Sequence, residues 1–308
     1  MRKTCLDIIC EIARKDDRVV FMGSDLGVAT LNRFKEEMPD RFFMEGISEA
    51  NVIGMAAGLA LEGRIVYVNT IASFLTRRCF EQVALDLCLH NVNVRLIGNG
   101  GGLVYAPLGP THEAIEDIAI FRALPGMTII APADAAEMRR VMPLTVNHSG
   151  PVYIRLGKGG DPIVSNDLSP FVIGKGLIMH EGDDALVVTT GVMLKTAMDA
   201  AHMLAAENIN IAVLHMPTIK PLDQACVLEY AARNPVVVTL EEHTIIGGLG
   251  SAVMEIIAEA NYPEPKRCKR LGIPDVFPDK YGSQASLLAY YELTAGNLIK
   301  TIKQLRSV

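Results

Sequence analysis

Short apolar runs alternate along the chain with longer stretches in which apolar and polar positions are mixed. In the first half, the apolar runs are rich in β-branched residues and cover residues 19–22, 65–68, 94–97, 128–130 and 152–154. The mixed stretches have helical spacing over residues 49–61, 80–89 and 133–142, and the N-terminus has the pattern of a helix that leads into the first strand. Strands that alternate with helices form parallel βαβ units, and strands without polar alternation are covered on both faces. The pattern predicts an α/β fold with a doubly wound parallel sheet.

The same alternation restarts after a polar, Gly- and Pro-bearing segment, residues 157–170, which has the composition of a linker. Beyond it, strands are predicted at residues 185–189, 211–214 and 236–240, with helices at 193–207, 221–233 and 250–260. We therefore expect two doubly wound domains, residues 1–165 and a smaller one, residues 166–308.

Composition and charge narrow the classes of function. Half of the 308 residues are apolar and 21% are charged, as in folded globular proteins, and the net charge of −6 without a long basic run argues against a nucleic-acid groove. No apolar run approaches the roughly 18 residues of a membrane-spanning helix, and the charged N-terminus lacks a signal-peptide pattern. The six cysteines include no C-x-x-C pair and no His lies at metal-ligand spacing. We expect a cytoplasmic protein with reduced thiols, no membrane segment and no metal ligands of its own.

Glu49 begins the predicted helix 49–61, where Ser48 is a candidate N-cap. A carboxylate in the first turn can simply complement the helix dipole. However, an aromatic loop, residues 69–74, follows the very next strand. Ligands bind at the carboxyl ends of parallel strands, so Glu49 and this loop form a candidate site.

A second candidate loop follows the strand that ends at residue 97. Four glycines within residues 98–102 permit a close backbone approach to a ligand or partner, and a loop this long between a strand and a helix is usually functional. His112, near the end of this loop, can donate a proton or bind a substrate hydroxyl. A packed structural histidine is the alternative interpretation.

Six ordered motifs carry a resemblance to a known family. They are GSDLG (23–27), EGISEANVIGMAAGLA (45–60), SFLTRRCFEQ (73–82), GPTHEAIEDIAIFRALPGMTIIAPAD (109–134), PVYIRLGKG (151–159) and EEHTIIGGLGSA (241–252). Together they resemble the pyrimidine-binding domain and the mostly parallel C-terminal domain of the thiamine-diphosphate-dependent transketolase family. The chain also resembles deoxyxylulose-phosphate synthase and, less closely, the β subunits of 2-oxoacid dehydrogenases.

The family's Gly-Asp-Gly motif, which belongs to the separate diphosphate-binding domain, does not occur in this chain. The chain therefore resembles the second subunit of a split transketolase. This resemblance implies an N-terminal transketolase subunit as partner, which would bind the diphosphate of thiamine diphosphate through Mg²⁺ (or Ca²⁺). It also implies a homodimer of this chain within an α2β2 heterotetramer.

The resemblance assigns the pyrimidine end of the cofactor to this chain. It implies that Glu49 hydrogen-bonds to N1′ of the aminopyrimidine and so promotes removal of the thiazolium C2 proton. Phe74 corresponds to the aromatic residue that stacks on the ring, with Leu75 as the alternative because the alignment needs one extra residue. Asp25 matches an acidic residue near the cofactor, or is a loop cap. Ile47, together with Met55 and Phe74, is expected to form an apolar pocket.

The resemblance also implies where substrate binds. His112 matches the histidine of the G-P-T-H motif that contacts substrate oxygens. Lys158 stands where transketolases commonly have an arginine that binds the sugar phosphate. Lysine is not equivalent to arginine there, because it offers a point charge instead of a bidentate group. Arg155 is a second candidate, with an internal ion pair as its alternative role. Two departures, Leu108 in place of an aspartate and Gly100–Gly102 in place of charged or imidazole groups, point to an unusual sugar.

The activity implied is transfer of a two-carbon ketol unit between sugars or sugar phosphates, by a chain that is inactive without its partner. Decarboxylative ligation of the deoxyxylulose-phosphate synthase kind and a non-catalytic assembly subunit are the alternatives. The motif at residues 241–252 is expected to serve structure and oligomer formation instead of nucleotide binding.

Overall fold

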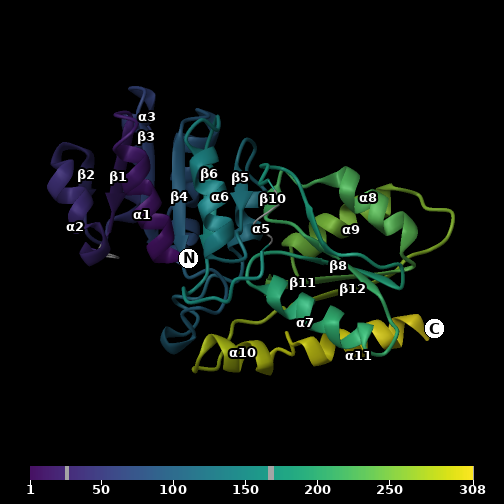
Figure 1. The fold of residues 1–308 in the computed structure, drawn as a ribbon. Helices are drawn as coiled ribbons and strands as arrows, with labels where there is room; N and C mark the ends of the chain where they lie inside the picture. Colours follow the sequence, from purple (N-terminus) through teal and green to yellow (C-terminus); the bar gives the residue numbers. More distant parts are fainter. Residues whose placement is uncertain (25–27, 166–169, 308) are drawn as a thin grey trace.

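The computed structural model describes residues 1–24, 28–165 and 170–307. Two α/β units lie side by side, with the N-terminus in the first and the C-terminus at the far end of the second (Figure 1). Each unit is built on one sheet, of seven strands in the first and five in the second.

The first sheet has the strand order β10-β5-β6-β4-β3-β1-β2. All neighbours in it are parallel except β10, which pairs antiparallel with β5. The bounds are β1 (Val19–Gly23), β2 (Phe42–Met44), β3 (Ile65–Ile71), β4 (Val94–Asn99), β5 (Thr128–Ile130), β6 (Val152–Leu156) and β10 (Thr218–Lys220). Strand β10 belongs to the first sheet although it comes after the expected linker in sequence. No single point in the chain therefore separates the residues of the two sheets. The boundary at residues 165 and 166 stays a prediction.

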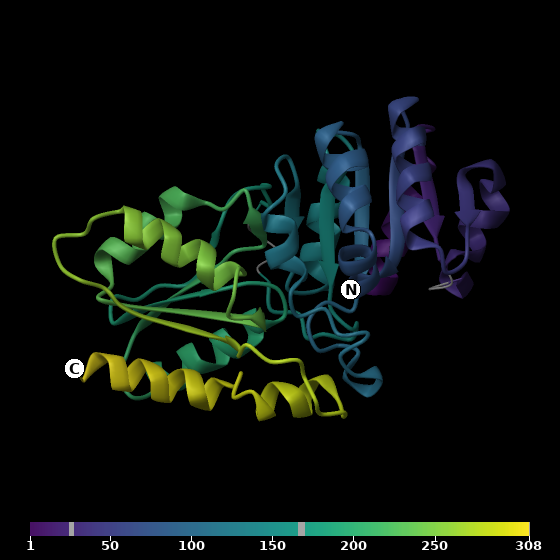
Figure 2. The ribbon, with the colours of Figure 1, turned by 180° about the vertical axis from the view of Figure 1, so that it is seen from behind.

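Helices cover both faces of the first sheet, which confirms the doubly wound arrangement. One face packs against α1 (Arg2–Ala13), α2 (Val28–Glu37) and α6 (Ala135–Thr145). The other, seen from behind in Figure 2, packs against α3 (Glu49–Leu61) and α5 (Asp117–Arg122) and the helical segments between β3 and β4. Strands β1, β4 and β6 are buried along their whole length, which explains their unbroken apolar runs.

The region between β3 and β4 differs from the expected single helix at residues 80–89. It consists of a π-helical turn η2 (Phe74–Arg78), a short α4 (Phe80–Gln82) and a second π-helical stretch η3 (Val83–Leu89). π-Helical turns are rare and often occur at functional sites. The wider turn places Phe74 and Arg78 at the two ends of η2, beside the carboxyl end of β3.

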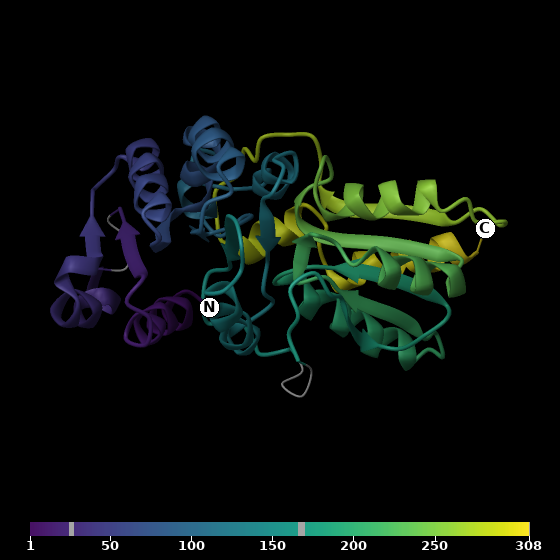
Figure 3. The same cartoon turned by 90° about the horizontal axis from the view of Figure 1, so that it is seen from above.

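The second sheet has the order β12-β11-β8-β9-β7, parallel except for the β7–β9 pair. Its strands are β7 (Leu177–His180), β8 (Ala185–Thr189), β9 (Ile211–His215), β11 (Val236–Thr244) and β12 (Arg267–Ile273). Helices α7 (Met193–Ala205), α10 (Gln284–Tyr290) and α11 (Ala295–Arg306) cover one face, and α8 (Gln224–Arg233) and α9 (Leu249–Glu259) the other (Figure 3). The edge strands β7 and β12 are only partly buried and were not predicted; β7 has only a short apolar run, and β12 begins with charged residues.

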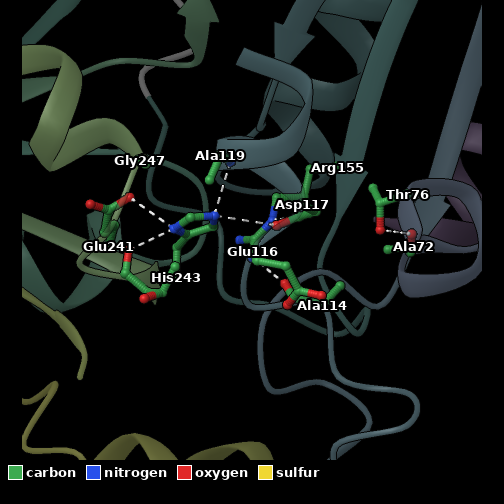
Figure 4. Close-up of polar contacts among 12 residues, drawn as sticks. Ala72, Thr76, Ala114, Glu116, Asp117, Ala119, Arg155, Glu241, His243 and Gly247 are labelled. Carbon is green, nitrogen blue, oxygen red and sulfur yellow. Dashed lines mark hydrogen bonds and ion pairs between the residues drawn. The ribbon is translucent and has the colours of Figure 1, made fainter. Parts of the chain in front are cut away.

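Buried charged residues join the two units. Arg155 of β6 donates from Nε to Oδ2 of Asp117 at 2.8 Å and from Nη2 to the backbone oxygen of Glu242 in β11. The Tyr153 hydroxyl also donates to Oδ2 of Asp117, at 2.7 Å. Figure 4 shows His243 between Asp117 and Glu241 at this junction. Among the described residues, no helix is both long and apolar enough to cross a bilayer.

Candidate functional site

Glu49 lies at the bottom of a small hollow at the carboxyl ends of β1 and β3. It is the first residue of α3 and only 6% exposed. The hollow is lined by residues from the strand ends and α3: Ser24, Val52, Val68, Asn69, Thr70 and Leu75. The expected Ser48 cap is not formed, because its hydroxyl donates to the backbone oxygen of Glu45 at 2.9 Å. Glu49 therefore stands at the helix N-terminus without a side-chain cap beside it.

A group of aromatic and cationic side chains lies beside Glu49. The Arg78 guanidinium carbon is 3.6 Å from the centre of the Phe74 ring, and Nη1 of Arg78 is 3.3 Å from Oε2 of Glu49. The His112 ring centre is 5.2 Å from that of Phe74 and 6.4 Å from that of Tyr105. The structure thus brings together Glu49, Phe74 and His112, which lie on three different segments of the chain.

His112 is partly exposed and held by its neighbours. Its Nδ1 shares a 2.9 Å hydrogen bond with the Thr111 hydroxyl, and its backbone oxygen accepts from the Ser73 hydroxyl at 3.1 Å. Arg77 supports the same loop by donating to the backbone oxygens of Pro110 and Glu113. Nε2 of His112 has no hydrogen-bond partner among the described residues, so this nitrogen is available to a ligand.

Lys158 faces a second hollow, of about 420 Å³, on the other side of Tyr105. Asn99, Gly100 and Leu108 line it, and so does Arg2 from the start of α1. The Met1 ammonium, 3.8 Å from Oδ2 of Asp161, ties the chain's first residues to the loop that carries Lys158.

Both cationic side chains in this hollow, Arg2 and Lys158, are exposed, and neither has a carboxylate within 4 Å among the described residues. Oδ1 of Asn99 is buried without a hydrogen-bond partner there. This hollow offers two cations to an anionic ligand.

Residues 1–160 match the family described as the transketolase pyrimidine binding domain, and residues 174–298 match the transketolase C-terminal domain. The chain belongs to the transketolase family.

Two relatives are named as subunits of transketolases. The chain is 38% identical to the 6-deoxy-6-sulfo-D-fructose transketolase subunit SqwH of Clostridium sp. (strain MSTE9), over 97% of this chain and 92% of that protein. It is 37% identical to an apulose-4-phosphate transketolase subunit of Phocaeicola vulgatus, over 97% and 95%. A solved structure described as a split gene transketolase, inactive β4 tetramer, matches with a TM-score of 0.88 and 36% identity over 99% of this chain and 97% of that one. The expected resemblance to split transketolase subunits is confirmed.

Several residues proposed from the transketolase resemblance are placed differently from expectation. Ile47 is 73% exposed and Met55 is also exposed, so in the single chain they do not form the expected apolar pocket with Phe74. The apolar wall beside Glu49 comes instead from Val52, Val68 and Leu75. The reason is that Ile47 precedes α3, outside the sheet's edge, whereas the others lie on elements packed against it. Asp25 lies outside the described residues.

The Arg155 side chain is buried and makes its contacts within the protein. Besides Asp117 and Glu242, it donates to the backbone oxygen of Ala114, and its side chain is 7% exposed. The alternative role given for it, an internal ion pair, is the one the structure shows. The proximity of Asp117 raises the pKa of Arg155 against the opposing effect of burial, so the guanidinium stays charged.

The glycine run at residues 100–102 is required by internal packing. A Cβ atom at Gly101 would lie 2.5 Å from the Arg155 side chain, and one at Gly102, which has φ of +67°, would lie 2.5 Å from Glu242. The backbone thus approaches buried side chains so closely that a larger residue at either position would clash with them.

Sequence reasoning missed Arg2 and Arg78 as members of the site. Nothing in the sequence predicts that Arg2 lies near Lys158, because the two residues are far apart along the chain and share no motif. Arg78 lay within the quoted SFLTRRCFEQ motif, and its position four residues after Phe74 in a helical segment was the available signal.

Proposed function

We propose that this chain is the pyrimidine-binding subunit of a thiamine-diphosphate-dependent transketolase that transfers a two-carbon ketol unit between sugars bearing an anionic group. The observation that supports this most is the meeting of a buried carboxylate, Glu49, with a half-buried aromatic ring, Phe74, and His112 at the carboxyl edge of the first sheet. A non-catalytic assembly subunit would not need that combination.

The residues around Glu49 fit the pyrimidine end of thiamine diphosphate. An aminopyrimidine needs one hydrogen-bonding partner for N1′ and one flat apolar surface, and Glu49 and Phe74 supply these. The cofactor, when bound, supplies a nucleophilic thiazolium carbon that attacks the donor carbonyl. Glu49, which is buried, would hold a proton shared with N1′. Asp25 and Ile47 remain proposed neighbours of the same ring.

The diphosphate end and the metal are assigned to a partner chain. Among the described residues there is no group of three His, Cys, Asp or Glu side chains able to hold a metal ion. We propose that Mg²⁺ (or Ca²⁺) and the diphosphate are bound by an N-terminal transketolase subunit, and that both chains work in the cytoplasm.

The substrate end is proposed for the hollow beside Tyr105. His112 reaches the reacting oxygens through Nε2, and Lys158 and Arg2 bind a phosphate or sulfonate at the far end of the sugar. The relatives named for sulfofructose and apulose-4-phosphate handle sugars that carry such groups. Leu108, half exposed at the rim, replaces a hydrogen-bonding group and so favours a donor without a hydroxyl there.

The experiment that tests this function co-expresses the chain with a genomically neighbouring chain that contains Gly-Asp-Gly. The purified complex, with thiamine diphosphate and Mg²⁺, is screened with ketose phosphates and sulfonated ketoses against aldose acceptors, and with pyruvate as a separate donor. Ketol transfer from a ketose supports the proposal. Turnover with pyruvate alone supports the decarboxylating ligase instead, and turnover by the isolated chain contradicts a shared site.

Assembly provides a separate prediction. A Cβ atom at Gly58 of α3 would meet nothing within 4 Å, and one at Gly54 would meet only Oδ2 of Asp86, at 4.0 Å. Met55, Leu85 and Leu89 are exposed nearby, so α3 and η3 present a largely apolar face that another backbone can approach closely. We propose that a second copy of this chain covers it, giving a homodimer alone and an α2β2 heterotetramer with the partner. The related inactive β4 tetramer favours self-association. Light scattering that shows a stable monomer, or a fully active one-to-one heterodimer, would contradict this.

A further inference from the structure

The Arg78 side chain connects the two residues proposed to hold the pyrimidine ring. It stacks on Phe74 at 3.6 Å and donates to Glu49 at 3.3 Å. The Glu49 side chain is 5% exposed and that of Arg78 is 49% exposed, so the guanidinium lies on the solvent side of the carboxylate. A ligand that binds the exposed side of Glu49 therefore competes with Arg78.

A guanidinium and an aminopyrimidine share the features that these contacts recognise. Both are planar, both stack on aromatic rings and both hydrogen-bond in their plane to a carboxyl group, the guanidinium by donating an N–H and the ring through a proton shared with N1′. A ring that stacks on Phe74 while hydrogen-bonded to Glu49 would make the two contacts that Arg78 already makes.

We propose that Arg78 is a placeholder: its guanidinium occupies the pyrimidine position in the free chain and is displaced when the ring of the cofactor binds. This inference rests on the proposed function for the identity of the incoming ring. It adds that the free site is closed by the chain's own side chain, which keeps the Glu49 carboxylate paired until the ring arrives.

The strength of the contact suits displacement. A half-exposed ion pair and a half-exposed cation–π contact are each weak, so together they reduce the affinity for a competing ring by about three- to tenfold. In the Arg78→Ala chain, Glu49 loses its partner and the incoming ring has nothing to displace. The variant should therefore bind the ring more tightly than the wild-type chain.

Thiamine is the probe of choice, since it carries the aminopyrimidine ring without the diphosphate that the partner would hold. Calorimetric titration of the isolated chain should give a dissociation constant about three- to tenfold lower for Arg78→Ala than for wild type. Arg78→Lys, which keeps the charge without the planar group, should fall between them. Equal or weaker binding by Arg78→Ala would overturn the proposal.

Arg233→Ala is the matched control. Arg233 stacks on Tyr230 at 4.1 Å and lies 3.5 Å from Oε1 of Glu229, so it combines the same two kinds of contact on α8, in the other unit. Its removal should leave thiamine affinity unchanged. A gain equal to that of Arg78→Ala would show a general effect of net charge and overturn the placeholder role.

A spectroscopic readout follows Arg78 directly. In the free chain, the Phe74 ring should shift the Nε–H resonance of Arg78, and this shift should vanish in Phe74→Leu and in wild type saturated with thiamine. Thiamine binding with an unmoved Arg78 signal contradicts the placeholder alone. If the Arg78 signal depends on Phe74 but neither wild type nor any variant binds thiamine, both the placeholder role and the assignment of the cofactor to this site are contradicted.

Discussion

Charged side chains meet in two regions of this molecule, and the regions differ in how their charges are satisfied. At the junction of the two units, Arg155, Asp117 and His243 are buried and in contact with one another and with backbone groups. At the edge of the first sheet, the available groups are instead a half-exposed Arg78, Nε2 of His112, and Lys158. Buried charges that pair with one another hold a structure together, whereas accessible charged groups can serve a ligand.

Replacing Asp117 should have the largest effect, because it tests the junction. Asp117→Ala leaves the Arg155 guanidinium buried without its counter-ion and should lower the free energy of unfolding by about 3–5 kcal/mol. Denaturant titration measures this. The control is Asp199→Ala, which removes a partly exposed pair with Lys195 and should cost at most about 0.5 kcal/mol. Equal losses in the two variants would remove the distinction between the regions.

Glu49→Gln should show the opposite behaviour, with lost activity and retained stability. The carboxamide keeps the shape but cannot hold the proton at N1′, so turnover of the partner-bound enzyme should fall by at least about two orders of magnitude. Melting temperature and assembly should match those of wild type. Glu36→Gln, an exposed carboxylate on α2, is the control for loss of a charge. Undiminished turnover at saturating cofactor would refute the role of Glu49.

Glu113 sits between the two regions and should make stability depend on pH. Glu113 is fully buried, and both of its carboxylate oxygens lack hydrogen-bond partners among the described residues. Burial raises the pKa of Glu113 to about 7; the positive charge of Arg77 opposes this shift and the negative charge of Glu242 adds to it. A carboxyl whose pKa is raised on folding stabilises the protein below its unfolded value and loses that stabilisation as pH rises through the folded value.

The free energy of unfolding of wild type should therefore fall by roughly 2 kcal/mol relative to Glu113→Gln between pH 5 and pH 8. Melting curves of both chains over that range measure the difference. Parallel pH profiles would show that Glu113 does not take up a proton on folding.

The smallest expected effect concerns the hollow beside Tyr105. Lys158→Met and Arg2→Met should each raise KM for a phosphorylated or sulfonated sugar about fivefold with little change in kcat, because each removes one partly solvated contact to the anion. Lys3→Met is the control, as Lys3 pairs with Asp7 on the same helix. An equal rise in KM for a sugar without an anionic group would place the anion elsewhere.

The pattern of apolar and polar residues predicted much of the fold, because strands and helix faces that are buried must be made of apolar residues. Strand β5 and helix α3 were predicted with their observed ends, and β8 likewise. Four strands were missed: β2, β7, β10 and β12. Strands β2, β7 and β10 have only three or four residues, and β12 carries charged residues in place of an apolar run. The same limit applied to helix 80–89, whose π-helical turns depend on packing and not on composition.

The site divides in the same way. Glu49, Phe74 and His112 were predicted as site residues from motifs that resemble the transketolase family. The structure brings them together, because strand ends converge in any parallel sheet. Other features of the site could be seen only in the tertiary structure. They are the ion pair of Arg155 with Asp117, the exposure of Ile47, the position of Arg2 in the same hollow as Lys158, and the contact of Arg78 with Glu49. Such contacts depend on strand order and on which side chains reach one another across elements, and no local spacing of residues encodes either.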